Sequence, residues 1–494
     1  MFLLEAQVKR VVFAALTALL LAACQNKAST PVLTNPPSDP TNLSFSNVTN
    51  SSVTLTWDAV PQATGYIVER KSRSAAYAQL ATPTAPTYTD TSLSADTDYS
   101  YGVSATNDKA RSNGVEKSVR TAAAAAPKFK VETVKTALDT IWTIRFAPDG
   151  RLFFTQRGDD IVKLHALDIS SEKITDYTGS SAVLGATGEN GVLGMELDPA
   201  FSSNNRVYIC YTYGTKDAPK NRVSSFTLSG NSLTGEKPLL EMRGGAHHNG
   251  CRVTYGPDSK LYVSMGDNDP AGDKLTGPNA TIAQDLGVMA GKIFRINPDG
   301  SIPSDNPFYA SLSGSFRAIW SFGHRNPQGL AFQPGTGALW STEHGPVTRD
   351  ELNVIKPGRN YGWPLCSGVQ AYGVPLTSGP QYDNTTYPCT GPNLNAANYQ
   401  PAVAEFAGGD SPAIAPSDLI FYTGNAFPAW KNDLFFVTLK TKRLYHLKLS
   451  GERVASQEIL IDSDYGRLRD IVQGPDGLIY ISTDEGLILR VFPQ

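Results

Sequence analysis

An irregular repeat runs through residues 128–494 and restricts the folds that this part of the chain can adopt. In each copy, a turn rich in Pro, Asp, Gly or Asn precedes an apolar run with the composition of a β-strand. Six copies start at residues 146, 197, 255, 332, 427 and 473, with the sequences "FAPDGRLFFTQ", "LDPAFSSNNRVYICYTY", "YGPDSKLYVSMGD", "FQPGTGALWSTEHG", "FPAWKNDLFFVTL" and "QGPDGLIYISTDEG".

Six such units predict an all-β fold, a six-bladed β-propeller over residues 128–494, because blades arranged in a ring protect their strand edges. Each copy spans about 60 residues, more than the ~40 to 50 of a bare four-stranded blade, so the surplus belongs to loops. We expect the last strand, "LILRVF", to close the ring by pairing with "KFKVETV" near residue 128. A parallel β-helix is the alternative, but its short, regular rungs fit these uneven repeats poorly.

Residues 38–122 form a separate pattern of short alternating strands, which predicts a small β-sandwich. Trp57, the strand of Tyr66 and the corner "LSADTDY" ending at Tyr99 resemble a fibronectin type III domain. That resemblance implies a core role for the aromatic residues and a hydrogen bond between the Tyr99 hydroxyl and upstream backbone. The module reads as a spacer or adhesive accessory, bounded by linkers at 24–37 and 123–127.

The N-terminal sequence predicts export. Lys9 and Arg10 precede "VVFAALTALLLAAC", an apolar run of signal-peptide length. Its ending resembles the bacterial lipobox, which implies a signal peptide at 1–23 and an acylated Cys24, while an ordinary secretory signal is the alternative. With Gln25 after the cysteine, the resemblance implies a lipid-anchored protein at the periplasmic face of the outer membrane or at the cell surface.

Four further cysteines lie in the repeat region, an even number that suits an oxidising compartment. Cys366 and Cys389 share a loop rich in Gly, Pro and Tyr, and we expect them to form a disulfide. Pairing of Cys210 with Cys251 stays open. Zinc is not indicated because no CxxC pair occurs. The net charge of −3, without any run of basic residues, gives no reason to expect a nucleic-acid partner.

Unusual polar residues gather in the loops of this repeat. "GGAHHNGCR" precedes the third repeat strand, "FGHRNPQGL" precedes the fourth, and "TEHGPVTRDELN" follows it, so that four of the six histidines lie in these segments. In a propeller, such loops meet at the mouth of the central channel, where residues distant in sequence form one pocket.

The ordered motifs resemble the soluble PQQ-dependent sugar dehydrogenases, also called aldose sugar or glucose/sorbosone dehydrogenases. They are "GENGVLGMELDPAF", "HHNGCRVTYGPDSKLYVSMGDN", "GKIFRINPDGSIPSDNPF", "GHRNPQGLAF", "EHGPVTRDELN", "NYGWP" and "GRLRDIVQGPDG". The resemblance implies oxidation of the C1 hydroxyl of an aldose sugar to a lactone, with hydride transfer to PQQ and electrons passed to an external acceptor.

Site residues follow from the same resemblance. His248 matches the family's catalytic base, with His247 in a supporting or structural role, and a neutral imidazole can accept a proton near pH 7. Arg325 faces the quinone oxygens, and a guanidinium suits anionic oxygen. The remaining residues that the resemblance assigns to PQQ are Asn326, Lys440, Arg467 and Arg469.

Calcium is also implied. The backbone carbonyls of Gly345 and Pro346 correspond to the pair that binds the ion beside PQQ, and carbonyl oxygens suit a hard cation that acts as a Lewis acid. A second, structural calcium would use Asp350 or Glu351 with the carbonyl of Tyr361.

Two departures from the family pattern bear on specificity. Glu189 in "GENGVLG" replaces the glutamine of glucose enzymes and places a carboxyl near the base, and residues 408–418 lack the aromatic and threonine residues that shape their sugar pocket. We therefore expect a wider pocket for several aldoses. The alternatives are a noncatalytic propeller that binds carbohydrate or protein, and a calcium-dependent lactonase.

Overall fold

The structure is a computed structural model that describes residues 36–72, 76–107, 110–122, 126–185, 188–268, 282–346, 348–367, 370–371, 398–406 and 413–494. The chain divides into two compact units, Met1–Ala125 and Ala126–Gln494. Cys24 and Cys389 lie outside the described residues, so lipidation and the Cys366–Cys389 pair stay predictions. Among the helices described, none is long and apolar enough to span a bilayer.

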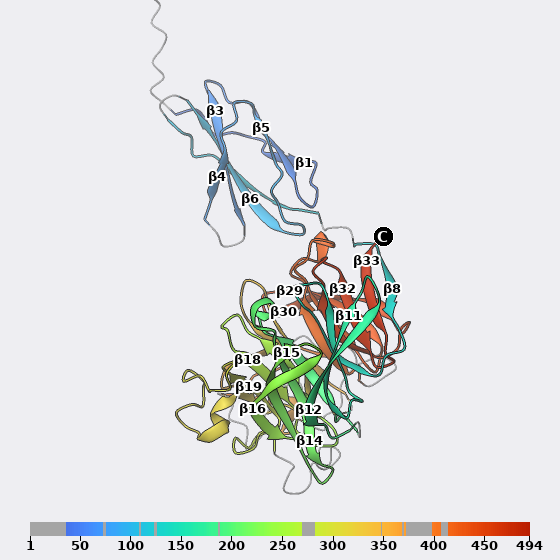
Figure 1. Cartoon of the computed structure of the whole chain (residues 1–494). Coiled ribbons are helices and arrows are strands. Elements are labelled where there is room, and N and C mark those ends of the chain that lie inside the picture. The colour runs from blue at the N-terminus through green and yellow to red at the C-terminus, as the bar shows by residue number, and fades with distance from the viewer. Residues whose placement is uncertain are drawn as a thin grey trace, which may run out of the picture. The chain divides into compact units, whose positions relative to one another are not determined.

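The first unit is the predicted β-sandwich, and Figure 1 shows its two layers. One layer contains β1 (Ser44–Ser46), β2 (Val53–Thr56) and β5 (Thr87–Asp90), and the other contains β4 (Ala78–Ala81), β3 (Gly65–Ser72), β6 (Asp98–Thr106) and β7 (Val115–Arg120). Trp57 and Tyr66 pack edge to face in its core, with ring centroids 5.2 Å apart. The corner prediction is confirmed, since the Ser94 N–H donates to the Tyr99 hydroxyl at 2.9 Å.

The second unit is the six-bladed propeller, and each blade is a four-stranded antiparallel sheet. The first three blades are β9 (Ile141–Phe146), β10 (Leu152–Gln156), β11 (Ile161–Asp168), β12 (Lys173–Ala182); β13 (Val192–Leu197), β14 (Arg206–Thr215), β15 (Ala218–Ser229), β16 (Ser232–Arg243); and β17 (Val253–Tyr255), β18 (Leu261–Met265), β19 (Lys292–Ile296), β20 (Ile319–Phe322). The others are β21 (Pro327–Phe332), β22 (Leu339–Glu343), β23 (Asp350–Ile355), β26 (Ala404–Phe406); β27 (Pro416–Phe421), β28 (Leu434–Thr438), β29 (Arg443–Ser450), β30 (Arg453–Asp462); and β31 (Leu468–Gln473), β32 (Ile479–Thr483), β33 (Ile488–Pro493), β8 (Phe129–Lys135).

Short elements decorate the blades. They are the helix α1 (Phe201–Asn204), the 3₁₀ turns η1 (Gly314–Ala318) and η2 (Pro428–Trp430), and the hairpin of β24 (Cys366–Ser367) with β25 (Gln370–Ala371). A single parallel bridge between Thr178 and Ser232 also links the outer strands of the first two blades.

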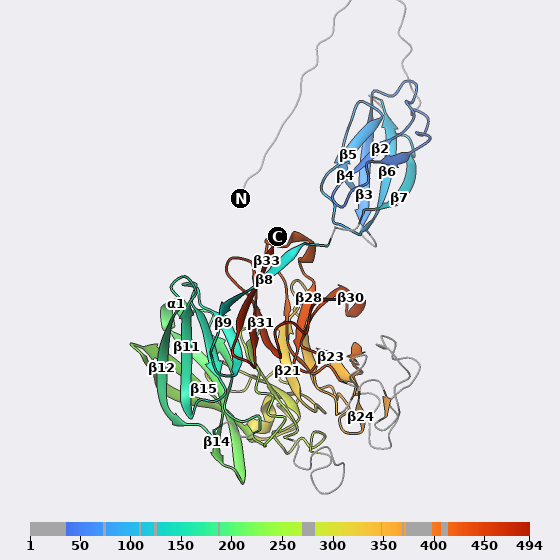
Figure 2. The same ribbon diagram turned by 90° about the vertical axis from the view of Figure 1, so that its right-hand side faces the viewer.

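The predicted closure of the ring is confirmed. Strand β33 pairs antiparallel with β8, with Val491 opposite Val131, so the chain segment after the sandwich completes the sixth blade. Figures 1 and 2 both show these two strands side by side near the C-terminus. The first strand of each blade lies innermost, and Figure 2 shows β9, β21 and β31 toward the middle of the propeller and β12 at its rim.

Each predicted repeat spans the turn from the innermost strand of a blade to the next strand. These turns require a left-handed residue, which explains their Gly, Asn and Asp content. At least one residue with positive φ occurs in each of the six turns, for example Gly150, Asn205, Ser259, Gly335, Asn432 and Gly477. The six turns therefore lie at one end of the propeller, and the loops before each first strand lie at the opposite end.

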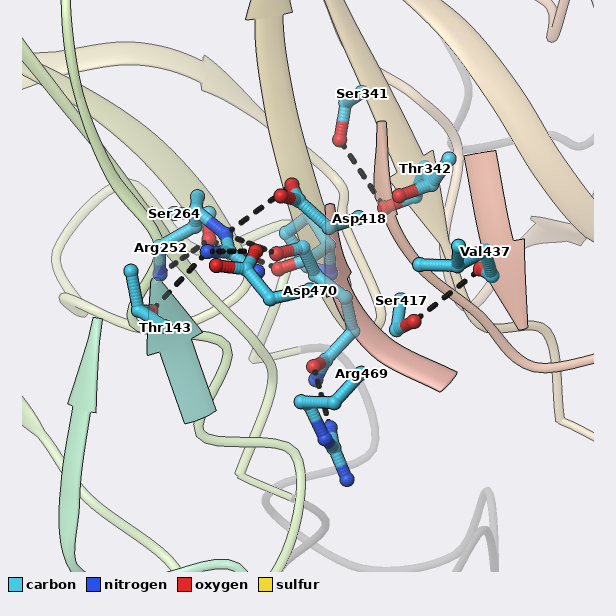
Figure 3. A network of polar contacts seen from close by, with 12 residues as sticks. Thr143, Arg252, Ser264, Ser341, Thr342, Ser417, Asp418, Val437, Arg469 and Asp470 are labelled. Atoms are coloured by element: carbon cyan, nitrogen blue, oxygen red, sulfur yellow. Dashed lines mark hydrogen bonds and ion pairs between the residues drawn. The ribbon is translucent and has the colours of Figure 1, made fainter. Parts of the chain in front are cut away.

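A buried polar network connects the innermost strands, and Figure 3 shows its central part. The Arg252 guanidinium lies 2.8 Å from Asp470 and 3.4 Å from Asp418, and all three side chains are almost fully buried. The Arg145 guanidinium lies between two carboxylates, 3.1 Å from Asp470 and 3.3 Å from Glu196. These five residues come from five blades.

The fourth blade joins this network through its backbone. The Gln328 carbonyl accepts a hydrogen bond from Arg252 Nε at 3.0 Å. The Pro327 carbonyl accepts another, from the Ser264 hydroxyl at 2.9 Å. All six blades are thus tied together at the axis. Figure 3 shows Thr143, Ser264 and Asp470 around Arg252.

Candidate active site

The sequence-predicted site residues lie at the end of the propeller opposite the repeat turns. Glu189, His248 and Arg325 precede the innermost strands β13, β17 and β21, and Arg469 lies at the start of β31. Lys440 and the segment of His344 to Pro346 lie in the loops that connect the second and third strands of their blades. Alternation of strand direction brings all these segments to the same face of the ring.

His248 is held by two carboxylates. Its residue has φ of 54° and its side chain is about 10% exposed. The backbone N–H donates to Glu189 Oε2 at 2.7 Å, and the ring Nδ1 lies 2.8 Å from Asp267 Oδ1. With Nδ1 directed to Asp267, Nε2 is the nitrogen left for a substrate. His247 is exposed, which fits the lesser role predicted for it.

Two glycines shape the histidine loop. A Cβ atom on Gly266 would lie 2.1 Å from the carbonyl oxygen of His248, and Gly250 has φ of 56°. Cys251 forms a disulfide with Cys210 of β14, with Cα atoms 5.8 Å apart, so the pairing that the sequence left open is present. The bond fastens the third blade's entry to the second blade, three positions after His248.

Asp267 is itself positioned by a tryptophan and by the arginine loop. Trp363 Nε1 donates to Asp267 Oδ2 at 2.7 Å, and the Asp267 N–H donates to the carbonyl of Arg325 at 2.8 Å. The Arg325 guanidinium also lies over the Trp363 ring, 5.5 Å from its centroid. The predicted base and the predicted quinone-facing arginine are therefore parts of one connected group.

Two polar residues next to Arg325 carry buried nitrogen atoms that hold no hydrogen bond to a described residue. Arg325 Nη1 donates to the carbonyl of His344 at 3.2 Å. The Asn326 side chain is fully buried, and its Oδ1 accepts from Gln328 Nε2 at 2.9 Å, whereas its Nδ2 has no hydrogen-bond partner among the described residues. The Nε2 atom of His344 is likewise buried, and no residue that the structure describes is hydrogen-bonded to it. Burial lowers the pKa of His344 well below its ordinary value, and the charges of Arg325 and Arg469 add to this effect.

His324 and Tyr361 form a buried support beneath this loop. Nδ1 of His324 lies 2.9 Å from Glu343 Oε2, and its Nε2 lies 2.9 Å from the Ser321 hydroxyl. The imidazole stacks on the Tyr361 ring, with centroids 4.5 Å apart. Both ring nitrogens of His324 are thus engaged, and its role is structural.

Three predicted cations differ in their surroundings. Arg469 is buried and pairs with Asp484 through two bonds of 2.8 and 3.0 Å, while the exposed Arg467 reaches the same carboxylate at 2.8 Å. Burial would raise the pKa of Asp484, but Arg469 and Arg467 together lower it to about 2. Lys440 is exposed, and its backbone N–H donates to the carbonyl of Ile414.

The predicted calcium ligands are arranged unequally. Gly345 and Pro346 lie in the loop between β22 and β23, and no described residue donates a hydrogen bond to their carbonyl oxygens. Both carboxylate oxygens of Asp350 are already engaged, Oδ1 by the Gly345 N–H at 2.9 Å and Oδ2 by the N–H groups of Ile414 and Ala415. Burial raises the pKa of Asp350. Glu351 accepts from Asn353 Nδ2 at 2.9 Å.

The hydroxyl of Tyr361 donates to the carbonyl of Val354 at 2.6 Å. Within the described ranges, no group of three or more His, Cys, Asp or Glu side chains is arranged to hold a metal ion. Calcium at this site therefore stays a prediction that rests on backbone carbonyls.

Sequence reasoning missed Asp267, Trp363 and Asp484. The sequence does contain a pattern that could have found the carboxylates. In three repeats, an acidic residue lies at or just beyond the end of the second strand of the blade. In these repeats Asp267 contacts His248, Glu343 contacts His324, and Asp484 contacts Arg469. Trp363 lies in the motif "NYGWP", to which the sequence alone assigns no role.

Comparisons with known proteins agree with this arrangement. A family model described as glucose/sorbosone dehydrogenase matches residues 138–490, and one described as fibronectin type III domain matches residues 38–118. Aldose sugar dehydrogenase YliI of Escherichia coli is 31% identical over 387 residues, which cover 75% of this chain and 95% of that relative. Quinoprotein glucose dehydrogenase B of Acinetobacter calcoaceticus is 28% identical over 426 residues, covering 74% of this chain and 87% of that protein.

A solved structure is also similar. The PQQ-bound form of an aldose sugar dehydrogenase from Streptomyces coelicolor superposes with a TM-score of 0.58 and 27% identity, over 75% of this chain and 100% of that one. The matched family model spans most of the propeller, and a fibronectin type III domain precedes it in the chain. The chain therefore belongs to the glucose/sorbosone dehydrogenase family.

Proposed function

We propose that the protein is a PQQ-dependent dehydrogenase that oxidises the C1 hydroxyl of aldose sugars to lactones and passes the electrons to an external acceptor. The observation that carries the proposal is the connected group of His248, Asp267 and Arg325, with Asn326 and His344 beside it. A general base held by a carboxylate and an adjacent guanidinium are the groups that this oxidation requires.

The residues present fit PQQ, a tricarboxylic quinone. Buried polar atoms without partners are costly, and the Nδ2 atom of Asn326 and the Nε2 atom of His344 are two such atoms in the same loop region. Arg325, Arg467 and Arg469 add cationic donors suited to the cofactor's oxygens and carboxylates. Lys440, exposed on the same face, is a further candidate for a carboxylate. PQQ supplies, when bound, the quinone that accepts the hydride.

Each protein group then has a definite task. His248 Nε2 accepts the proton of the C1 hydroxyl, and Asp267 stabilises the imidazolium through Nδ1. Arg325, oriented by the His344 carbonyl and the Trp363 ring, offers donors to developing negative charge on oxygen. Glu189 acts through the loop, because its carboxylate accepts the backbone N–H of His248 in a left-handed conformation.

Calcium belongs to the same proposal. Gly345 and Pro346 would hold the ion through their carbonyl oxygens, which suit its hard character. For a second ion, Glu351 and the Tyr361 carbonyl fit better than Asp350, because three backbone N–H groups already satisfy the Asp350 carboxylate.

We further propose export and lipid anchoring through Cys24. The "LAAC" sequence supports it, and the Cys210–Cys251 disulfide suits an oxidising compartment. Metabolic labelling with radioactive palmitate in the native host tests the anchor. We expect label in the wild-type protein and none in Cys24→Ser, whereas equal labelling of both would contradict the proposal.

Reconstitution tests the enzymatic proposal. The purified apo-protein is incubated with PQQ and calcium, and reduction of an artificial electron-accepting dye is followed with a panel of aldoses. We expect PQQ uptake, activity with several sugars and its loss in His248→Ala. Absence of PQQ uptake would favour a noncatalytic binding propeller, and hydrolysis of lactones without dye reduction would favour a lactonase.

A further inference from the structure

Trp363 contacts three parts of the proposed site: the loop before Arg325, the Arg325 guanidinium and the carboxylate of Asp267. The side chain is about 5% exposed and lies between β23 and β24. Its backbone is fixed on both sides, because its N–H donates to the carbonyl of Gly323 at 2.9 Å and its carbonyl accepts from Gln284 Nε2 at 2.6 Å. Gly323 is two residues before Arg325 in sequence, so the tryptophan is anchored to the arginine loop itself.

The indole makes two different contacts with functional groups. Its N–H donates to Asp267 Oδ2 at 2.7 Å, on the carboxylate whose other oxygen faces His248 Nδ1. Its ring carries the Arg325 guanidinium at 5.5 Å from the centroid, a cation–π geometry. One rigid side chain therefore touches the partner of the base and the arginine expected to face the quinone.

Two other tryptophans of the propeller show that these contacts are not a general feature of its packing. Within the described part of the chain, the indole nitrogens of Trp320 and Trp340 are buried and have no hydrogen-bond partner. Trp320 even carries an arginine on its ring, Arg295 at 5.0 Å from the centroid. The combination of an arginine on the face and a carboxylate on the N–H occurs at Trp363.

We propose that Trp363 is a positioning residue that sets the strength of the Asp267–His248 interaction and holds Arg325 in place for the cofactor. This inference rests on the proposed function. The two contacts separate its effects, since the N–H acts on the base and the ring face acts on the arginine.

The direction of the first effect follows from electrostatics. A hydrogen bond from the indole stabilises the negative charge of Asp267 and weakens its pull on the proton at His248 Nδ1. Loss of that donor strengthens the pull, so the imidazolium persists to higher pH. The acid limb of the kcat/KM profile, where the base must lose its proton, then moves to higher pH.

Two variants separate the contacts. Trp363→Phe keeps an aromatic face but loses the N–H, so we expect the acid limb to rise by about half a pH unit with the PQQ Kd within about twofold of wild type. Trp363→Leu loses both, so the same limb shift should accompany a PQQ Kd about fivefold weaker in equilibrium dialysis of the apo-protein. Trp320→Phe is the matched control and should change neither quantity.

A wild-type measurement keeps the inference testable if variants at 363 do not fold. In protein labelled with ¹⁵N-tryptophan, one of the six indole signals should shift with pH as His248 titrates, and Asp267→Asn should abolish that shift. Six pH-independent indole signals would overturn the inference, as would an unchanged acid limb in a folded Trp363→Phe. Absence of PQQ uptake by the wild type would instead contradict the proposed function, while the indole titration in the apo-protein would still decide the role of Trp363.

Discussion

His248 and Asp267 of the third blade approach each other at 2.8 Å between Nδ1 and Oδ1, and the indole of Trp363 occupies the other oxygen of the same carboxylate. A neutral asparagine at 267 would direct its carbonyl oxygen to the indole N–H and its amide toward Nδ1. The histidine would then be held in the tautomer with its proton on Nε2, where the base must be free. The pair therefore determines whether His248 can accept a proton.

Asp267→Asn should consequently lower kcat by about 100-fold, the size of a general-base contribution, with a much smaller change in PQQ affinity. Dye-linked kinetics at saturating sugar measure kcat, and dialysis of the apo-protein measures PQQ binding. The matched control is Asp176→Asn, which removes a carboxylate at 2.8 Å from Nδ1 of His165 in the first blade. Wild-type kcat in Asp267→Asn would contradict a catalytic role for the pair.

Asp484 should link stability to acid pH. Its pKa falls from the ordinary 3.8 to about 2, a difference worth about 2 kcal/mol. Because the folded-state pKa is depressed, this stability is present above pH 4 and is lost as the pH falls toward 2. Urea unfolding followed by tryptophan fluorescence should show Asp484→Asn destabilised by about 2 kcal/mol at pH 7 and by about half as much at pH 3.

The exposed Asp464 offers a control in the same segment, and Asp464→Asn should match the wild type at both pH values. A destabilisation of Asp484→Asn that is equal at pH 7 and pH 3 would show that packing, not the ion pair with Arg469 and Arg467, accounts for it.

The central network predicts opposite behaviour for two neighbouring carboxyl groups. Burial and the adjacent Asp470 raise the pKa of Asp418 well above its ordinary value despite Arg252, which favours the protonated form of Asp418. Burial would raise the pKa of Asp470 too, but Arg252 and Arg145 outweigh it and lower this pKa. Asp418→Asn, which mimics the protonated acid, should change the free energy of unfolding by under about 1 kcal/mol.

Asp470→Asn should lower the free energy of unfolding by about 3 to 5 kcal/mol, because it removes the buried carboxylate that Arg252 and Arg145 share. The change of stability with pH also has a predicted direction. Because the folded-state pKa of Asp418 is raised, the protonated group favours the folded state below the pKa of the unfolded chain, and this contribution is lost as the pH rises. Asp418→Asn should therefore be at least as stable as the wild type at pH 8. Urea unfolding at pH 5 and pH 8 measures both variants, and equal losses of stability would contradict the opposite pKa shifts of Asp418 and Asp470.

The sequence predicted the propeller because its repeat encodes a backbone requirement. Residues such as Gly150, Asn205 and Asn432 are needed wherever an inner strand turns back, and this requirement is visible without contacts. The closure of β33 on β8 followed from the need to pair a last strand. Sequence reasoning also placed His248 and Arg325 on one face, because loops of one kind share one end of a ring.

The partners of these residues could not be read in the same way. Trp363 lies 96 positions from Asp267, and Arg252, Asp418 and Asp470 come from three blades. Their contacts depend on the rotation between blades and on side-chain rotamers, which local patterns do not encode. Buried charges are also atypical of a core, so composition favours reading them as exposed residues.

The Cys210–Cys251 disulfide should stabilise the propeller and hold the entry to His248. It closes a loop with a sequence separation of 41, for which chain entropy gives about 3 to 4 kcal/mol. Cys210→Ala with Cys251→Ala should lower the free energy of unfolding by that amount. The double variant should also raise the KM for sugar more than it lowers kcat, because the disulfide fixes the loop and takes no part in the chemistry. Reductant should lower the free energy of unfolding of the wild type and leave that of the double variant unchanged. The stabilising role would be contradicted if the wild type, unfolded and refolded in the presence of reductant, kept its full free energy of unfolding.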